Sequence, residues 1–338
     1  MDIETLSREL VRKIMESDKV IIIPHNRIDF DAIGSAIGLS IVVKELGREP
    51  FIVVNDSLQL MSPALKSIIE ESKKDFHIIN KEKYKAIAGP NDLYILTDFN
   101  RKMLTCVPEY LDNPENIVII DHHNIYDETI ESNYQYINNE RSSASEIVVC
   151  LLNDCYNALG AVSPNVANYL YAGISLDTGL YSGQLKNNIS ADTFDSLAVL
   201  QRIGANGNRV KTWFKENLND YLKVQNLVGK AQLFNLPMAF MFDSNTDYTR
   251  DLIAKAADMG LNIGDASFAC GMIEDDIVSI SGRSTGTVNI GAIMKELGGG
   301  GKIDSGAAKF ENTSVEEVHK RLAKVLRPFY IVSDDDNN

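Results

Sequence analysis

The sequence predicts an α/β protein: a doubly wound parallel sheet in an N-terminal domain, a smaller α+β domain at the C-terminal end, and a helical linker between them. In the first half, uninterrupted apolar runs alternate with helical patterns, and such runs are typical of parallel strands that are buried on both faces. The 338 residues are too many for one ordinary domain and fit two. We expect domains at 1–190 and 234–330, the linker at 191–233, and a disordered tail at 331–338.

Each element of the first half is predicted from a local pattern. Residues 20–23 have the composition of a buried strand, and the apolar helical pattern after them ends at Gly47, as a left-handed capping glycine favours. The predicted strands are 20–23, 51–54, 93–97 and 117–120, and the predicted helices are 32–46, 145–159 and 164–174.

Apolar residues recur at helical spacing from 209 to 233, among them Val210, Trp213 and Leu218. One interpretation is a single long helix that connects the two domains. An ordinary core helix of the first domain explains the same pattern equally well.

The C-terminal part has the pattern of a smaller α+β unit. Two apolar runs flank Glu274-Asp275-Asp276, which is a hairpin signal. Ser314 and Glu317 fit a capping box at the start of the last helix. The predicted strand before the hairpin is 238–242, and the predicted helices are 249–259, 289–297 and 313–326.

Composition limits the partners and the location. With a net charge of -14, the chain is a poor candidate for duplex DNA, whose phosphates require clustered Lys and Arg. A small anionic substrate is compatible with this charge, because divalent cations reverse the local field. The four cysteines form no CxxC pair, and no apolar run approaches the roughly 18 residues of a membrane span. We therefore expect a cytoplasmic protein without a membrane partner.

Carboxylates and imidazoles follow three of the predicted strands. They are His25, Asp29 and Asp31 after the first strand, Asp98 after the third, and Asp121, His122 and His123 after the fourth, with Asp177 further along the chain. In an open parallel sheet, ligands bind at the carboxyl ends of the strands, near a switch in strand order. Oxygen ligands mixed with imidazole suit Mn²⁺ or Mg²⁺, and the lack of thiolate argues against structural zinc. Six or seven ligands are too many for one ion and fit two.

A pair of ions predicts a reaction class. Two ions about 3.5–4 Å apart share a bridging water, lower its pKa, and stabilise charge on phosphorus oxygens. The pattern therefore favours hydrolysis of a phosphodiester or phosphate bond in a small nucleotide. A lone Asp after a strand is more often a helix cap or a turn residue. The combination of HxxxDxD after one strand with DHH after another favours ligands over caps.

These residues resemble the DHH phosphoesterase superfamily, which includes RecJ-type exonucleases, nano-RNases and manganese-dependent inorganic pyrophosphatases. The motifs that match are 24–38, Asp98, 121–123 and Asp177, and the C-terminal part is similar to DHH-associated domain 1 through 280–284 and the glycine run 298–301. The chain looks closest to the phosphodiesterase module of GdpP-type cyclic di-AMP phosphodiesterases. This likeness depends on DAIGSAIG at 31–38, SSASEIV at 142–148, and 279–301.

The resemblance implies a role for each site residue. His25, Asp29 and Asp98 hold one ion, and Asp31, Asp98, His122 and Asp177 hold the other, so that Asp98 bridges them. Asp121 orients these ligands, and His123 donates to the scissile phosphate, which makes Asp98, Asp121 and His123 the catalytic set. The implied substrate-binding residues of the second domain are Arg283, Ser284, Gly298, Gly299, Gly300, Gly301 and Lys302. The implied cofactors are two Mn²⁺, with Mg²⁺ or Co²⁺ as alternatives, and the implied assembly is a homodimer.

One departure from the family pattern leaves the substrate open. The family usually has histidine directly after the glycine run, where this chain has Lys302. Lysine keeps a positive donor but loses the flat imidazole. Three functions follow: a cyclic di-AMP phosphodiesterase that yields pApA and continues to AMP, a nano-RNase or pAp phosphatase for short linear nucleotides, and a nucleotide sensor that has lost catalysis. Inorganic pyrophosphatase is a weaker fourth candidate function, because the second domain does not look like the type of second domain expected for that small substrate.

Overall fold

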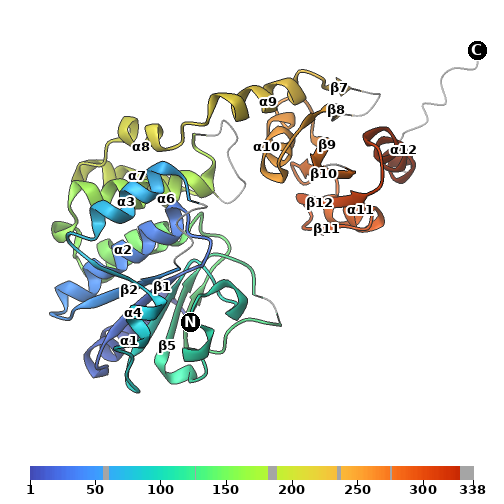
Figure 1. Ribbon diagram of the computed structural model, residues 1–338. Coiled ribbons are helices and arrows are strands. Elements are labelled where there is room, and N and C mark those ends of the chain that lie inside the picture. Colours follow the sequence, from blue (N-terminus) through green and yellow to red (C-terminus); the bar gives the residue numbers. More distant parts are fainter. Residues whose placement is uncertain (56–60, 126, 182–188, 234–236, 275, 328–338) are drawn as a thin grey trace, which may run out of the picture. The chain divides into compact units, whose positions relative to one another are not determined.

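The computed structural model describes residues 1–55, 61–125, 127–181, 189–233, 237–274 and 276–327. The chain forms two compact units, which we call unit 1 (Met1–Lys215) and unit 2 (Glu216–Asn338) (Figure 1). Their boundary falls inside the segment for which we predicted a linker. The predicted disordered tail at 331–338 lies outside the described residues. Within those residues, every helix is too short or too polar to cross a lipid bilayer.

Unit 1 contains a six-stranded sheet in the order β3-β2-β1-β4-β5-β6, and every neighbouring pair is parallel. The strands are β1 (Val20–Pro24), β2 (Pro50–Val54), β3 (His77–Asn80), β4 (Leu93–Thr97), β5 (Ile117–Asp121) and β6 (Tyr134–Ile137). The chain leaves β1 toward one edge and returns at β4 to build the other half, so the strand order switches between β1 and β4. The predicted doubly wound parallel sheet is confirmed.

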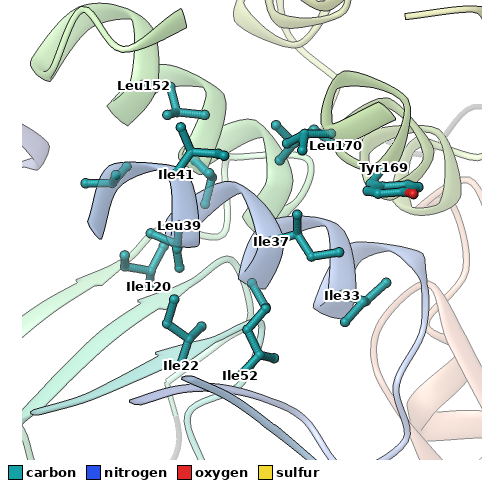
Figure 2. Packing of buried hydrophobic residues seen from close by; sticks show 14 of the residues in the cluster. Ile22, Ile33, Ile37, Leu39, Ile41, Ile52, Ile120, Leu152, Tyr169 and Leu170 are labelled. Atoms are coloured by element: carbon teal, nitrogen blue, oxygen red, sulfur yellow. The ribbon is translucent and has the colours of Figure 1, made fainter. Parts of the chain in front are cut away.

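Alternating strand residues face two separate cores. In β1, Ile22 belongs to the larger cluster, which includes α2, α5 and α6, whereas Ile21 and Ile23 belong to the smaller cluster on the opposite face. Both faces are therefore apolar, which explains the uninterrupted run in the sequence. Figure 2 shows α2 between Ile22 of the sheet and Leu170 of α6.

The helices of unit 1 are α1 (Ile3–Glu16), α2 (Phe30–Glu45), α3 (Pro63–Ser72), α4 (Lys81–Lys85), α5 (Ala144–Cys150), α6 (Pro164–Thr178), α7 (Ala191–Ile203) and α8 (Gly207–Trp213). Helices α2, α5 and α6 lie where helices were predicted but differ at their ends, whereas α3 and α4 have no predicted counterpart. The helix predicted at 145–159 ends earlier, because α5 passes into a π-helical turn at Leu151–Cys155. Gly47 has a φ of 72°, as its predicted capping role requires.

Two features of this region were predicted wrongly. The strands β3 and β6 were missed, because they are short edge strands whose polar and half-buried residues form no apolar run. The single helix predicted at 209–233 is two helices, α8 and α9 (Leu218–Val228). Asn217 caps the second one by accepting a hydrogen bond from the N–H of Asn219 at 2.8 Å. The apolar spacing continues across this break, so periodicity alone did not reveal it.

Unit 2 contains a second sheet in the order β11-β12-β10-β9-β8-β7, in which only β8 and β9 pair in parallel. Its strands are β7 (Gln232–Leu233), β8 (Met238–Asp247), β9 (Ala266–Glu274), β10 (Ile277–Ser284), β11 (Gly300–Gly301) and β12 (Ser305–Glu311), and its remaining helices are α10 (Arg250–Gly260), α11 (Ile290–Glu296) and α12 (Val315–Leu326). The predicted smaller α+β domain and its hairpin are confirmed. Strand β12 was missed, because glycine and alanine give it no alternating apolar pattern.

Candidate metal centre

The predicted ligands meet at the carboxyl edge of the unit 1 sheet. Strands β1 and β4 are neighbours at the switch point, so His25 after β1 and Asp98 after β4 lie side by side. Asp121 is the last residue of β5, the next strand over. Asp177 comes from a different kind of element, the last turn of α6. The structure thus brings all six predicted metal ligands together.

Asp98 is the centre of this cluster. Its Oδ2 lies 3.1 Å from Nε2 of His25, and its Oδ1 lies 3.4 Å from Nε2 of His122 and 3.7 Å from Nδ1 of His123. The residue is buried and has a φ of 66°, a left-handed conformation that costs a non-glycine residue about 1–3 kcal/mol. Its N–H donates to the carbonyl of Ile120 at 3.1 Å, which fixes the turn between two strand ends.

His25, Asp29 and Asp98 form the first potential ligand group, with their donor atoms within 4.8 Å of one another. Asp29 is also the N-cap of α2, since its Oδ1 accepts the N–H groups of Asp31 and Ala32 at 3.0 Å each. Its Oδ2 lies 3.6 Å from Nε2 of His25. One carboxylate oxygen therefore caps the helix while the other faces the cluster, so the cap and ligand interpretations of Asp29 are compatible.

Asp31, Asp98, His122 and Asp177 form the second potential ligand group. Nε2 of His122 lies 3.0 Å from Oδ2 of Asp177 and 4.0 Å from Oδ2 of Asp31. Asp31 is fully buried, and its two oxygens accept the N–H groups of Ala144 and Ser145 at 2.8 Å each. These N–H groups belong to the first turn of α5, where the helix dipole favours a carboxylate.

The two residues that hold Asp31 were not predicted as part of the site. Ala144 and Ser145 lie within SSASEIV at 142–148, which served only as a mark of family likeness. The available signal was Ser143, which caps α5 by accepting from the N–H of Glu146 at 3.0 Å. A predicted helix start near a strand-end cluster is a candidate for holding an anion.

Asp121 orients the two histidines that follow it. Its Oδ1 accepts the N–H groups of His122 at 2.8 Å and of His123 at 3.2 Å. The same oxygen lies 2.8 Å from Nδ1 of His123. A carboxylate only accepts, so Nδ1 carries the hydrogen in this contact. The ring of His123 is half exposed, whereas Asp121 is fully buried.

The charges of the cluster explain its protonation without ions. Burial opposes the charged form of His25, but its contacts with Asp29 and Asp98 outweigh burial and raise its pKa to about 10. Burial likewise opposes protonation of His122, but Asp177 and Asp98 raise its pKa to about 11. Burial of Asp98 is outweighed by His122 and His25, which hold the pKa of its carboxyl well below its usual range. Two protonated imidazoles therefore supply positive charge beside Asp98.

Buried polar atoms that lack a hydrogen-bond partner show whether the residues of the cluster fit metal ions. Asp98 Oδ1, His122 Nε2 and Asp121 Oδ2 are buried and have no hydrogen-bond partner within the part of the chain that the structure describes. A buried polar atom without a partner costs about 1–3 kcal/mol. The first two atoms face each other in the second group, where an ion would satisfy both. Oxygen and imidazole donors suit Mn²⁺ and Mg²⁺, so the residues fit a pair of divalent ions that share Asp98.

The predicted substrate residues of unit 2 make contacts within that unit. Arg283, near the end of β10, donates through Nε to Asp258 at 2.6 Å and through Nη1 to Ser281 at 2.9 Å. Ser284 is buried, and its Oγ accepts the N–H groups of Gly286 at 3.0 Å and Val288 at 3.1 Å. Ser284 thus has a structural task of its own.

The glycine run also has local structural reasons. Gly298 follows α11 with a φ of 84°, which favours glycine, and Gly300–Gly301 form β11 beside β12. A Cβ at Gly299 would meet Cα of Ala308 at 2.7 Å. Lys302 is exposed, and its N–H donates to the carbonyl of Ser305 at 2.7 Å. Substrate binding by these residues stays a prediction.

Comparison with solved structures agrees with this fold. An exopolyphosphatase-related protein from Bacteroides fragilis is similar with a TM-score of 0.73 and 20% identity, covering 96% of this chain and 97% of that one. RecJ in complex with Mn²⁺ from Thermus thermophilus has a TM-score of 0.52 and 11% identity, covering 96% of this chain and 55% of that one. At these identities the likeness concerns the fold.

Comparison with known sequences identifies the family. The cyclic-di-AMP phosphodiesterase GdpP of Geobacillus thermodenitrificans (strain NG80-2) is 32% identical over 96% of this chain. The chain spans 50% of that relative's length. Residues 19–174, within unit 1, match the N-terminal domain of the DHH family, and residues 235–328, within unit 2, match the DHHA1 domain. The chain therefore contains the N-terminal domain of the DHH family in unit 1 and a DHHA1 domain in unit 2.

Proposed function

We propose that this chain is a phosphodiesterase that hydrolyses cyclic di-AMP to linear pApA and continues to AMP with the help of two divalent cations, for which we expect Mn²⁺. The observation that carries the proposal is Asp98, which is buried on a left-handed turn and belongs to both potential ligand groups described above and to a third, with His122 and His123. The resemblance of the chain to GdpP over 96% of its length supports the cyclic di-AMP substrate.

The chain's residues divide the work. When bound, the two ions supply a water of lowered pKa and positive charge opposite the phosphorus oxygens. His25, Asp29 and Asp98 would hold one ion, and Asp31, Asp98, His122 and Asp177 would hold the other. Asp121 holds Nδ1 of His123, which leaves Nε2 of that half-exposed ring to donate to the scissile phosphate. Hydrolysis adds water across one phosphodiester bond and yields a hydroxyl and a phosphate monoester.

Recognition of the nucleotide is assigned to unit 2. In our proposal, Arg283 and Lys302 contact phosphate, and the backbone N–H groups of the glycine run 298–301 approach it closely. Arg283 would then have to exchange its contact with Asp258 for one with the substrate, or bind the substrate through guanidinium nitrogens other than the Nε that contacts Asp258. We further propose a homodimer in the cytoplasm, by resemblance to the family; sedimentation of the purified chain tests the dimer.

Lys302 favours a second candidate function. Without the family histidine, the chain has lost an imidazole that stacks on a base, and a short linear substrate depends less on that contact. The candidate is a nano-RNase or pAp phosphatase that uses the same metal ligands.

A substrate panel separates these functions. We would incubate the purified chain with Mn²⁺ and cyclic di-AMP, pApA, pAp or a short RNA, repeat each reaction with chelator, and quantify products by chromatography. Asp195→Ala, at an exposed position on α7, provides a control carboxylate substitution outside the cluster. Intact cyclic di-AMP beside cleaved short RNA would reject the first function in favour of the second. Nucleotide binding without turnover under any divalent ion would indicate a sensor.

A further inference from the structure

Phe30 lies between two predicted metal ligands, and its side chain packs on other aromatic rings. It is the first residue of α2, flanked by Asp29 and Asp31, and is only 8% exposed. Its ring stacks on Trp213 with centroids 6.2 Å apart and an interplanar angle of 27°. Its centroid is 5.0 Å from that of Phe214. The residue between the ligands is therefore anchored on aromatic rings that are distant in sequence.

Those rings belong to the last helix of unit 1 and are themselves fixed. Trp213 ends α8 and packs on Tyr169 of α6 at 6.0 Å, and Phe214 packs on Tyr181 at 5.4 Å. We call Phe30, Tyr169, Tyr181, Trp213 and Phe214 the aromatic cluster. Helix α8 is tied to α6 at its other end as well, since the N–H of Asn206 donates to Oδ1 of Asn168 at 2.7 Å.

The aromatic cluster also marks the end of unit 1. Phe214 is the C-cap of α8, and unit 2 begins two residues later at Glu216. Phe214 thus packs on Phe30, which lies between Asp29 and Asp31. The end of unit 1 and the first turn of α2 are therefore packed against each other.

Helix geometry shows why this anchor matters. Successive residues of an α-helix project about 100° apart, so fixing the direction of Phe30 fixes that of Asp31. Asp29 is the extended N-cap of α2, and it is tied to the same turn because its Oδ1 accepts the N–H groups of Asp31 and Ala32. Asp29 must turn one oxygen to its own helix and the other to His25, and Asp31 must reach the N–H groups of α5. A rotation of the first turn would misplace both carboxylates together.

We propose that Phe30 and Phe214 are positioning residues for the metal centre: their contact fixes the first turn of α2, and with it Asp29 and Asp31, against the end of unit 1. The inference rests on the proposed function, because it assumes that these carboxylates bind divalent ions. A core role alone would give Phe30 an effect on stability but no special effect on metal affinity.

The test compares matched variants of the full chain. Phe30→Leu and Phe214→Ala each remove one side of the contact. Phe76→Leu is the control, because Phe76 is also 8% exposed and belongs to the same hydrophobic cluster of unit 1. Binding of Mn²⁺ is titrated by electron paramagnetic resonance of the free ion, and thermal melting gives stability. Phe30→Leu and Phe214→Ala should weaken Mn²⁺ binding roughly tenfold or more, as expected for residues that orient ligands. Phe76→Leu should lower the melting temperature and leave Mn²⁺ binding unchanged, and Phe214→Tyr should bind as the wild type does.

Trp213 supplies a second measurement, because it is the single tryptophan of the chain. Its emission should differ between the wild type and Phe30→Leu, because that substitution removes the ring stacked on Trp213, and it should be unchanged in Phe76→Leu. Wild-type Mn²⁺ affinity in both Phe30→Leu and Phe214→Ala, or an equal loss in Phe76→Leu, would overturn the inference alone. A wild-type chain that binds no divalent ion would overturn the proposed function together with it.

Discussion

Replacing Gly173 with alanine adds one methyl group where α6 packs against α2. A Cβ at this position would meet Oδ1 of Asp31 at 2.8 Å and Cα of Asp31 at 2.9 Å, and would lie closer still to Oγ of Ser145. The gap between 2.8 Å and the 3.4 Å of ordinary contact requires a shift of about 0.6 Å. Metal–ligand distances tolerate about 0.2 Å, so we expect the Asp31 ion to bind at least roughly tenfold more weakly.

Stability should change much less than metal binding. Overpacking costs about 1–3 kcal/mol. Glycine to alanine inside a helix returns about 1 kcal/mol, so the net loss is roughly 0–2 kcal/mol. For a unit of this size, each kcal/mol lowers the melting temperature by about 2–4 °C. The variant should therefore fold and yet bind poorly the ion that Asp31 holds.

Gly38→Ala is the matched control for Gly173→Ala. A Cβ at Gly38 would meet Cγ1 of Val148 at 2.7 Å and Cδ2 of Leu170 at 2.9 Å, which are side-chain atoms away from the ligands. It overpacks α2 against the same pair of helices, α5 and α6. Calorimetric titration with Mn²⁺ should show a loss for Gly173→Ala only. Equal Mn²⁺ affinity in the two variants would refute the claim that close helix packing sets the position of Asp31.

Three further predictions concern the ions and the substrate. Asp98→Ala should lower turnover by more than about 10³-fold, because it removes the ligand shared by both groups; unchanged activity would exclude Asp98 from the site. Arg283→Ala should raise KM by an amount equivalent to about 1–3 kcal/mol, with little change in kcat; a loss confined to kcat would contradict a binding role. The raised pKa values of His25 and His122, about 10 and about 11, mean that Mn²⁺ must displace protons at neutral pH. Mn²⁺ affinity should therefore increase with pH, and titrations in buffers of different ionisation enthalpy should reveal released protons. Binding without proton release would count against these imidazoles as ligands.

The sequence predicted those parts of the fold and cluster that depend on local pattern. Buried parallel strands produce uninterrupted apolar runs, so β1, β4 and β5 were found, and with them the strand ends that carry His25, Asp98 and Asp121. Edge strands and the break between α8 and α9 leave no such pattern. The hydrogen bond from Ala144 to Asp31 could not be predicted from local sequence patterns either, because the two residues are 113 positions apart in the chain. The same holds for Phe30, whose partners begin at Trp213.

The fold fixes the candidate ligands by contacts that involve no ion. Asp31 is held by two N–H groups of α5, and Asp29 by two of its own helix. Asp98 is held by the turn that bonds to Ile120. A carboxylate has about four acceptor positions, so Asp31 and Asp29 keep lone pairs for a cation after these bonds are made. Because the arrangement is built from helix ends and strand ends, the ligands need little reorganisation when ions bind. The free energy of binding is then available for displacing protons from His25 and His122. Asp98 Oδ1 and His122 Nε2, which are buried and have no hydrogen-bond partner among the described residues, would then contact an ion.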